Sequence, residues 1–117
     1  MRIAIVLLAA APLLAALPAQ AQDSAVASTQ IAQGDFAQAE SMLLAELRIH
    51  PGRPELLLNL AAVYAKTGRA DAARGLYTKV LGTDDVLMDL AVDRTAGSHA
   101  LAQRGLRRLD TVQFSAH

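Results

Sequence analysis

Apolar side chains recur at steps of three and four residues over most of the chain after residue 22, which is the spacing of helices that bury one face. The spacing predicts helices over residues 23–33, 35–50, 54–67, 70–81 and 98–110. Pro51 stops the second of these helices because proline cannot continue the backbone hydrogen-bond ladder. Pro54 suits the first turn of the third helix, where a missing N–H costs nothing.

The pattern changes between Asp84 and Thr95. Apolar residues there stand at every second position, at Val86, Met88, Leu90 and Val92. A period of two predicts an extended segment, and a short helix is the alternative because Leu87 and Ala91 blur the alternation. Gly97 and Ser98 then predict a turn and an N-terminal cap for the last helix.

The chain also matches itself when it is shifted by 34 residues, the distance from Gly34 to Gly68. Gly34 recurs as Gly68, Ala39 as Ala73, Leu47 as Leu81 and Ala27 as Ala61, while Val26 aligns with Leu60 and Leu43 with Tyr77. A fixed period of this length is typical of stacked helical hairpins, each of which needs a neighbour to bury its apolar face. The repeat therefore predicts an all-α fold and a binding module rather than an enzyme.

Residues 1–21 have a different organisation. Arg2 supplies a positive charge, residues 3–17 form an apolar run broken by Pro12, and residues 19–21 form a small-x-small site. This layout predicts a secretory signal peptide that is cleaved after Ala21. A membrane-spanning helix is the alternative, but it needs about 20 apolar residues. We therefore expect a periplasmic or secreted protein with no stable membrane insertion after cleavage.

Composition narrows the chemistry. The 117 residues include no cysteine, which excludes disulfides, thiol catalysis and thiolate metal sites within this chain. The 11 basic and 11 acidic residues give a formal net charge of zero. A balanced charge gives no indication of nucleic-acid binding, so we predict no nucleic-acid partner.

The second repeat unit, from Pro54 to about Leu87, carries the most characteristic residues. They are Leu57, Leu60, Ala61, Tyr64, Gly68, Ala73, Tyr77 and Val80, and the first unit adds Gly34, Phe36, Ala39 and Pro51. At these spacings the chain resembles the tetratricopeptide repeat (TPR) family. Gln30, Glu46 and Asp85 depart from the family pattern, at an aromatic position, a small position and the closing proline. The resemblance implies antiparallel helical hairpins stacked as a short right-handed solenoid with a C-terminal capping helix.

This resemblance and the signal peptide together predict the domain organisation. The signal peptide covers residues 1–21, the helical repeat domain 22–110 and a frayed tail 111–117. Within the domain the two units span about 22–53 and 54–87, followed by a degenerate linker and cap over 88–110. Small Ala61 and Ala73 are expected to let neighbouring helices approach closely, while Tyr64 and Tyr77 fill the space between layers.

In TPR proteins the first helix of each pair lines a concave groove that holds a partner polypeptide. Carried onto the second unit, the groove residues are Glu55, Leu58, Asn59, Ala62 and Lys66. Asn59 is the favoured contact because its amide can both donate to and accept from a peptide backbone, and the alternative is that it bridges groups within the fold. The resemblance implies a protein or peptide partner. The other hypothesis is a homo-oligomer, in which a second copy of the chain covers an open repeat edge.

The histidines are candidate ligands and bases. His50, His99 and His117 lack the spacing of a metal site. Ser98, His99 and Asp93 together offer a nucleophile, a base and an orienting acid, but adjacent side chains point in different directions on a helix. We therefore predict no catalytic residue, no bound metal and no cofactor.

Two charged groups lie at or beyond the end of the second unit. The acidic residues between 84 and 93 lack the glycine and the spacing of a calcium loop, so they are expected to form a solvated linker. The solvent-exposed face of the last helix is expected to carry Arg104, Arg107 and Arg108.

Overall fold

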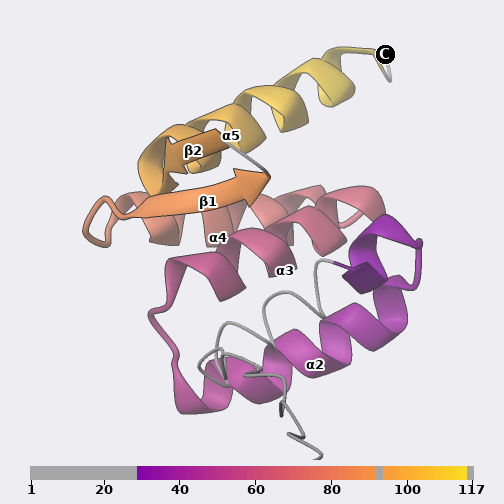
Figure 1. Cartoon of the computed structure of the whole chain (residues 1–117). Helices are drawn as coiled ribbons and strands as arrows, with labels where there is room; N and C mark the ends of the chain where they lie inside the picture. Colours follow the sequence, from indigo (N-terminus) through magenta and orange to yellow (C-terminus); the bar gives the residue numbers. More distant parts are fainter. Residues whose placement is uncertain (1–28, 92–93, 116–117) are drawn as a thin grey trace, which may run out of the picture.

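The computed structural model of the chain describes residues 29–91 and 94–115 (Figure 1). Its helices are α2 (Phe36–Ile49), α3 (Pro54–Lys66), α4 (Ala70–Leu81) and α5 (Ser98–Ser115), and residues 29–32 are also helical. Its strands are β1 (Leu87–Ala91) and β2 (Arg94–Gly97). The fold is mostly helical with packed helix pairs, as predicted. The expected signal peptide and the start of the first expected helix, including Val26 and Ala27, lie outside the described residues.

The helices pack in chain order as consecutive antiparallel layers (Figure 1). Helix α3 lies in the middle of the molecule, between α2 on one side and α4 with α5 on the other. Helix α5 runs back along α4 and also contacts α3. It therefore lies where the first helix of a third unit would lie in a stack of hairpins.

The repeat is visible in how the helices end. Gly34 and Gly68 both have a φ of 79°, a left-handed conformation that glycine adopts without steric penalty. In both units the residue after the glycine donates its N–H to the carbonyl five positions earlier, at 2.9 Å in the first unit and 2.8 Å in the second. The next helices begin at Phe36 and Ala70, which are as far apart in the chain as the two glycines. The period therefore fixes the turn inside each hairpin.

Two apolar clusters lie on opposite sides of α3. One contains Leu56, Leu60 and Val63 of α3 with Ala39 and Leu43 of α2. The other contains Leu57, Leu58 and Ala61 of α3 with Ala73, Tyr77 and Val80 of α4 and Ala102 and Leu109 of α5. Tyr64 is half-buried against both clusters, and Tyr77 is buried. The expected position of the two tyrosines between layers is confirmed.

A β-hairpin connects α4 to α5. The expected extended segment is confirmed as β1, but the sequence did not predict that the chain turns back as β2, with Met88 opposite Ala96 and Asp89 opposite Thr95. Met88 packs against the core, which anchors the hairpin to the helices. Met88 is also the position one repeat period after Pro54, where a third unit would begin, whereas α5 begins only at Ser98. The hairpin is therefore an insertion between the second unit and α5.

Helix α5 is longer than expected and closely packed. It continues to Ser115, so residues 111–115 are helical where the sequence predicted a frayed tail. The ring of Tyr77 lies against Gly105, and a Cβ atom there would overlap the ring. Burial raises the pKa of the Tyr77 hydroxyl, and nearby Arg108 offsets part of the rise. Within 29–91 and 94–115, no helix has the length and apolar character needed to cross a membrane.

Candidate functional site

One stripe of helix α3 belongs to neither apolar cluster. The other sides of the helix pack against α2 and against α4 with α5. The stripe consists of Glu55, Asn59, Ala62 and Lys66, of which the first three are half-buried and Lys66 is exposed. Steps of four, three and four residues place all four on one side of a helix. The structure therefore brings together four of the five residues expected from the sequence, and we call them the α3 stripe.

Leu58 does not belong to this stripe. Its side chain is 8% exposed and packs in the core with residues of α4 and α5. The expectation that Leu58 lines a surface is therefore wrong. The reason is that α5 packs on α3 as well as on α4, so a position beside the stripe becomes interior.

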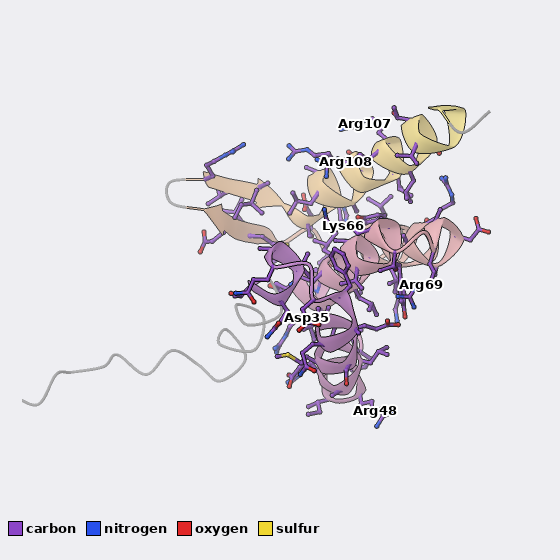
Figure 2. The ribbon with its side chains drawn as sticks, turned by 90° about the vertical axis from the view of Figure 1, so that its right-hand side faces the viewer. Asp35, Arg48, Lys66, Arg69, Arg107 and Arg108 are labelled. Atoms are coloured by element: carbon purple, nitrogen blue, oxygen red, sulfur yellow. The ribbon has the colours of Figure 1, made fainter. Side chains whose placement is uncertain are left out.

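The α3 stripe runs from an acidic end to a basic end. Glu55 lies in the first turn of α3 and Lys66 in the last, so each charge opposes the partial charge of its helix end. Eleven positions separate the two residues, which at 1.5 Å per residue is a distance of about 16 Å along the axis. In Figure 2, Lys66 is labelled near Asp35 at the start of α2, and Arg107 and Arg108 of α5 are labelled above it.

An ion pair joins the first unit to the second. The guanidinium of Arg69 binds the carboxylate of Glu40 through two hydrogen bonds of 2.8 and 2.9 Å, and its carbon lies 4.4 Å from the centre of the Tyr64 ring. The hydrogen bond from Arg69 lowers the pKa of Glu40. Both side chains are partly exposed, at 43% and 24%, so the pair orients α2 and the α3–α4 turn more than it stabilises the fold.

A second ion pair lies at the equivalent place one layer further on. Arg74 is the residue equivalent to Glu40 one repeat later, and its guanidinium binds the carboxylate of Asp110 in α5 at 2.9 Å. The charges are reversed, but both pairs join the second helix of a unit to the next part of the stack. This correspondence supports the assignment of α5 as the first helix of a third layer.

The start of α5 is held by Asp85, which was expected to lie in a solvated linker. The Asp85 carboxylate accepts a hydrogen bond from the backbone N–H of His99 at 3.1 Å, and so caps the helix from outside it. Ser98 instead exchanges hydrogen bonds with Val86: its hydroxyl accepts from the Val86 N–H at 2.9 Å, and its own N–H donates to the Val86 carbonyl at 2.8 Å. The expectation that Ser98 caps the helix is wrong, because its hydroxyl faces the hairpin.

The sequence offered one signal for Asp85. Gly97 is close to it, and a Cβ atom at Gly97 would come within 2.7 Å of the Asp85 carboxylate. A glycine directly before a helix leaves room for a carboxylate from another part of the chain to reach the helix N-terminus. Spacing alone could not identify that acid, because Asp85 and His99 are brought together by the hairpin.

The Ser98 and His99 side chains both make structural hydrogen bonds. Nε2 of His99 lies 2.6 Å from the carbonyl oxygen of Thr83, to which it donates. The Ser98 side chain is fully buried and lies 3.4 Å from the Asp85 carboxylate. Asp93, the third member of the arrangement that the sequence suggested, lies outside the described residues. These hydrogen bonds of Ser98 and His99 with Thr83, Asp85 and Val86 join the start of α5 to the end of α4 and to the hairpin, and we call them the clasp.

Comparison with known families identifies the repeated region. Residues 30–86 match the family model described as Tetratricopeptide repeat. The match covers α2, α3 and α4 and ends just before β1. No curated protein and no solved structure gives a significant match to the chain.

Proposed function

Because residues 30–86 belong to the tetratricopeptide repeat family, whose repeats generally mediate protein–protein interaction, we propose that this chain binds a partner polypeptide along the α3 stripe. The observation that carries the proposal is that Glu55, Asn59, Ala62 and Lys66 lie on one side of α3 and belong to neither of the two apolar clusters of the described residues. Ala62 offers an apolar contact between polar neighbours. The Asn59 amide can add hydrogen bonds to a peptide backbone beyond those within the fold.

The charges of the α3 stripe suggest the kind of segment it takes. A length of about 16 Å fits about five residues of extended chain. Glu55 favours a basic group at one end of such a segment and Lys66 favours an acidic group at the other. The two charges would thus set the direction of a bound segment more than its affinity.

We further propose that the protein works as a non-enzymatic adaptor outside the cytoplasm of a bacterium. The residues that suggest export are the apolar run and the small-x-small site within 1–21. Mass spectrometry of the protein from the cell envelope and from the medium tests this proposal. A product that begins at Gln22 supports it, and a cytoplasmic product that begins at Met1 contradicts it.

Site-specific photocrosslinking tests the binding surface without knowledge of the partner. A photoreactive amino acid replaces Ala62 on the α3 stripe in one variant and Ala72, which is exposed on α4, in a matched control. We expect a crosslinked partner from position 62 and none, or a different set, from position 72. Equal crosslinking from both positions would contradict the α3 stripe as the binding surface.

Affinity measurements with the crosslinked partner then assign the residues. Asn59→Ala and Lys66→Ala should each weaken binding about tenfold, the value of one hydrogen bond to a charged or backbone group. Lys79→Ala, on the exposed side of α4, is the control and should leave binding unchanged. An unchanged affinity in both Asn59→Ala and Lys66→Ala would show that these two side chains do not contact the partner.

A further inference from the structure

The hairpin carries an unusual concentration of exposed apolar side chains. Of the six large hydrophobic residues that are exposed in the described part of the chain, three lie at or beside β1: Val86, Leu87 and Leu90, at 38%, 73% and 46%. Clustered exposed apolar residues mark interaction surfaces more often than isolated ones do. Leu87 and Asp89 share the strand face opposite to Met88, which packs on the core. Leu90 shares the Met88 side of the strand, so the side away from the core carries Leu87 and Asp89. We call these two residues, together with the exposed Asp84 just before the strand, the hairpin face.

The charge of this surface is negative. Between residues 84 and 97 the described residues include three aspartates and one arginine, and all four are exposed. Asp85 is used by the helix cap, whereas Asp84 and Asp89 make no ion pair with another described residue. A partner of this surface would therefore combine apolar area with positive charge.

The chain itself carries such a surface on α5. Arg104, Arg107 and Arg108 are exposed, and Arg104 and Arg107 make no ion pair within the described ranges. Val112 lies one helical turn beyond Arg108 and is 65% exposed. These four residues form what we call the α5 face. It offers basic groups beside an exposed apolar side chain, which complements the hairpin face in both charge and polarity.

The two faces point away from each other along the molecule. Figure 2 shows the hairpin projecting from the helices on the side where α5 begins, whereas α5, which carries Arg107 and Arg108, extends the other way. A twofold axis near the start of α5 would place each hairpin face opposite the α5 face of the other copy. Both contacts would then form at once and the assembly would close as a pair, as a twofold interface requires.

We propose that two copies of this chain associate as a twofold dimer, with the hairpin face of each docked on the α5 face of the other. This interaction is separate from the proposed use of the α3 stripe, so either can fail alone. It also assigns a role to the insertion between the second unit and α5. The insertion adds a contact surface that the helical repeats themselves do not provide.

Charge-reversal variants of the full chain test the dimer. Variant one carries Arg104→Glu and Arg107→Glu, and variant two carries Asp84→Arg and Asp89→Arg. Arg108 is left in place because it lies close enough to Tyr77 to affect the pKa of that hydroxyl. Each variant alone places like charges across both contacts, so its dimer dissociation constant should rise on the order of a hundredfold.

Mixing the two variants gives the sharper result. In the mixed pair every reversed acid faces a reversed base, so a one-to-one heterodimer should form with about the affinity of the unmodified homodimer. Mixtures of Arg48→Glu/Lys79→Glu with Glu46→Arg/Asp71→Arg have the same net charges at other positions. They control for non-specific attraction and should give no preferential heterodimer.

Sedimentation velocity at micromolar concentration measures all of these species, and melting curves followed by circular dichroism verify folding. The dimer of the unmodified chain should weaken with added salt, be lost in each variant and be restored on mixing. A monomer at every concentration in low salt would overturn the proposal. A dimer that both variants retain, or a mixture that is not rescued although both variants are folded, would overturn it as well.

Discussion

The junction between α2 and α3 and the junction between α4 and α5 solve the same packing problem with very different connections. Residues 50–53 join the first two helices, whereas residues 82–97, including the hairpin, join the second two. In both cases the second helix of a unit packs against the next helix in the chain. In both cases a charged residue at an equivalent position, Glu40 or Arg74, forms an ion pair with the next part of the stack. The stacking is therefore set by the packed faces rather than by the loop.

The difference between the junctions lies in their packing residues. At the first junction, Leu43 packs with Leu60 and other aliphatic side chains of α3. At the second, the equivalent residue is Tyr77, and its larger ring is accommodated against a glycine, Gly105. A larger residue on one helix has thus been matched by a smaller one on the next. The second junction should be the more sensitive to added volume.

Gly105→Ala tests this sensitivity and should have the largest effect. The added methyl group overlaps the Tyr77 ring, and such overpacking destabilises folded proteins by about 1–3 kcal/mol. Gly75→Ala in α4 is the matched control, because nothing lies within 4 Å of its Cβ position. That substitution should stabilise the protein by about 0.5–1 kcal/mol through helix propensity. Urea denaturation measures both, and equal effects of the two substitutions would contradict the described packing of α5 on α4.

Asp85→Ala tests the clasp that fixes the longer connection. Loss of the helix cap should cost about 1 kcal/mol, because the His99 N–H loses its side-chain acceptor. Hydrogen exchange should rise in the hairpin and in the first turn of α5, while α2 and α3 keep their protection. Asp71→Ala, at an exposed position of α4 outside the hairpin, is the control. Uniform exchange changes across all helices would argue against a local clasp.

Gly34→Ala and Gly68→Ala test whether the two units are equivalent. Both glycines have a φ of 79° with open space around the Cβ position, so alanine is disfavoured by backbone conformation alone. Each substitution should destabilise the protein by about 1 kcal/mol. The two values should agree within experimental error when measured by denaturation. A neutral effect at Gly34 beside a large one at Gly68 would mean that only the second unit keeps the repeat geometry.

The Glu40–Arg69 ion pair should give the smallest effect. The pKa of Glu40 in the folded protein is lowered from the ordinary value of 4.5. Ionised Glu40 therefore adds stability above pH 4.5, and that added stability is lost as the pH falls through the lowered pKa. The Glu40→Gln protein should therefore lose less stability than the unmodified protein between neutral pH and about pH 3. Glu46→Gln serves as the control for a loss of charge on α2. An identical acid dependence in the Glu40→Gln protein and the unmodified protein would show that the pair contributes nothing measurable.

Much of the repeated body could be predicted from the sequence because local rules determine it. Gly34, Gly68, Pro51 and Pro54 each act within one turn of chain, and the apolar stripes follow from helical spacing. The turns inside the hairpins and the positions of the tyrosines are therefore predicted correctly. The extended character of β1 was also predictable, since alternation is a local property.

The features that sequence did not reveal depend on contacts between distant segments. Leu58 is buried in the cluster that α3 forms with α4 and α5, and Asp85 becomes a cap because the hairpin brings it to His99. The return strand β2 has no apolar alternation of its own, since Arg94 and Thr95 are exposed. The binding assignment of Asn59 and Lys66 stays a prediction, because helix geometry places them on one stripe but does not identify what binds there.

Helix α5 packs on α4 as α3 packs on α2, with the hairpin inserted outside that stack. Nuclear Overhauser contacts between the Tyr77 ring protons and the α protons of Gly105 test this arrangement most directly. We expect strong contacts there, together with contacts between the methyl groups of Leu43 and Leu60 at the first junction. A spectrum that shows the Leu43–Leu60 contacts but none between Tyr77 and Gly105 would contradict the arrangement.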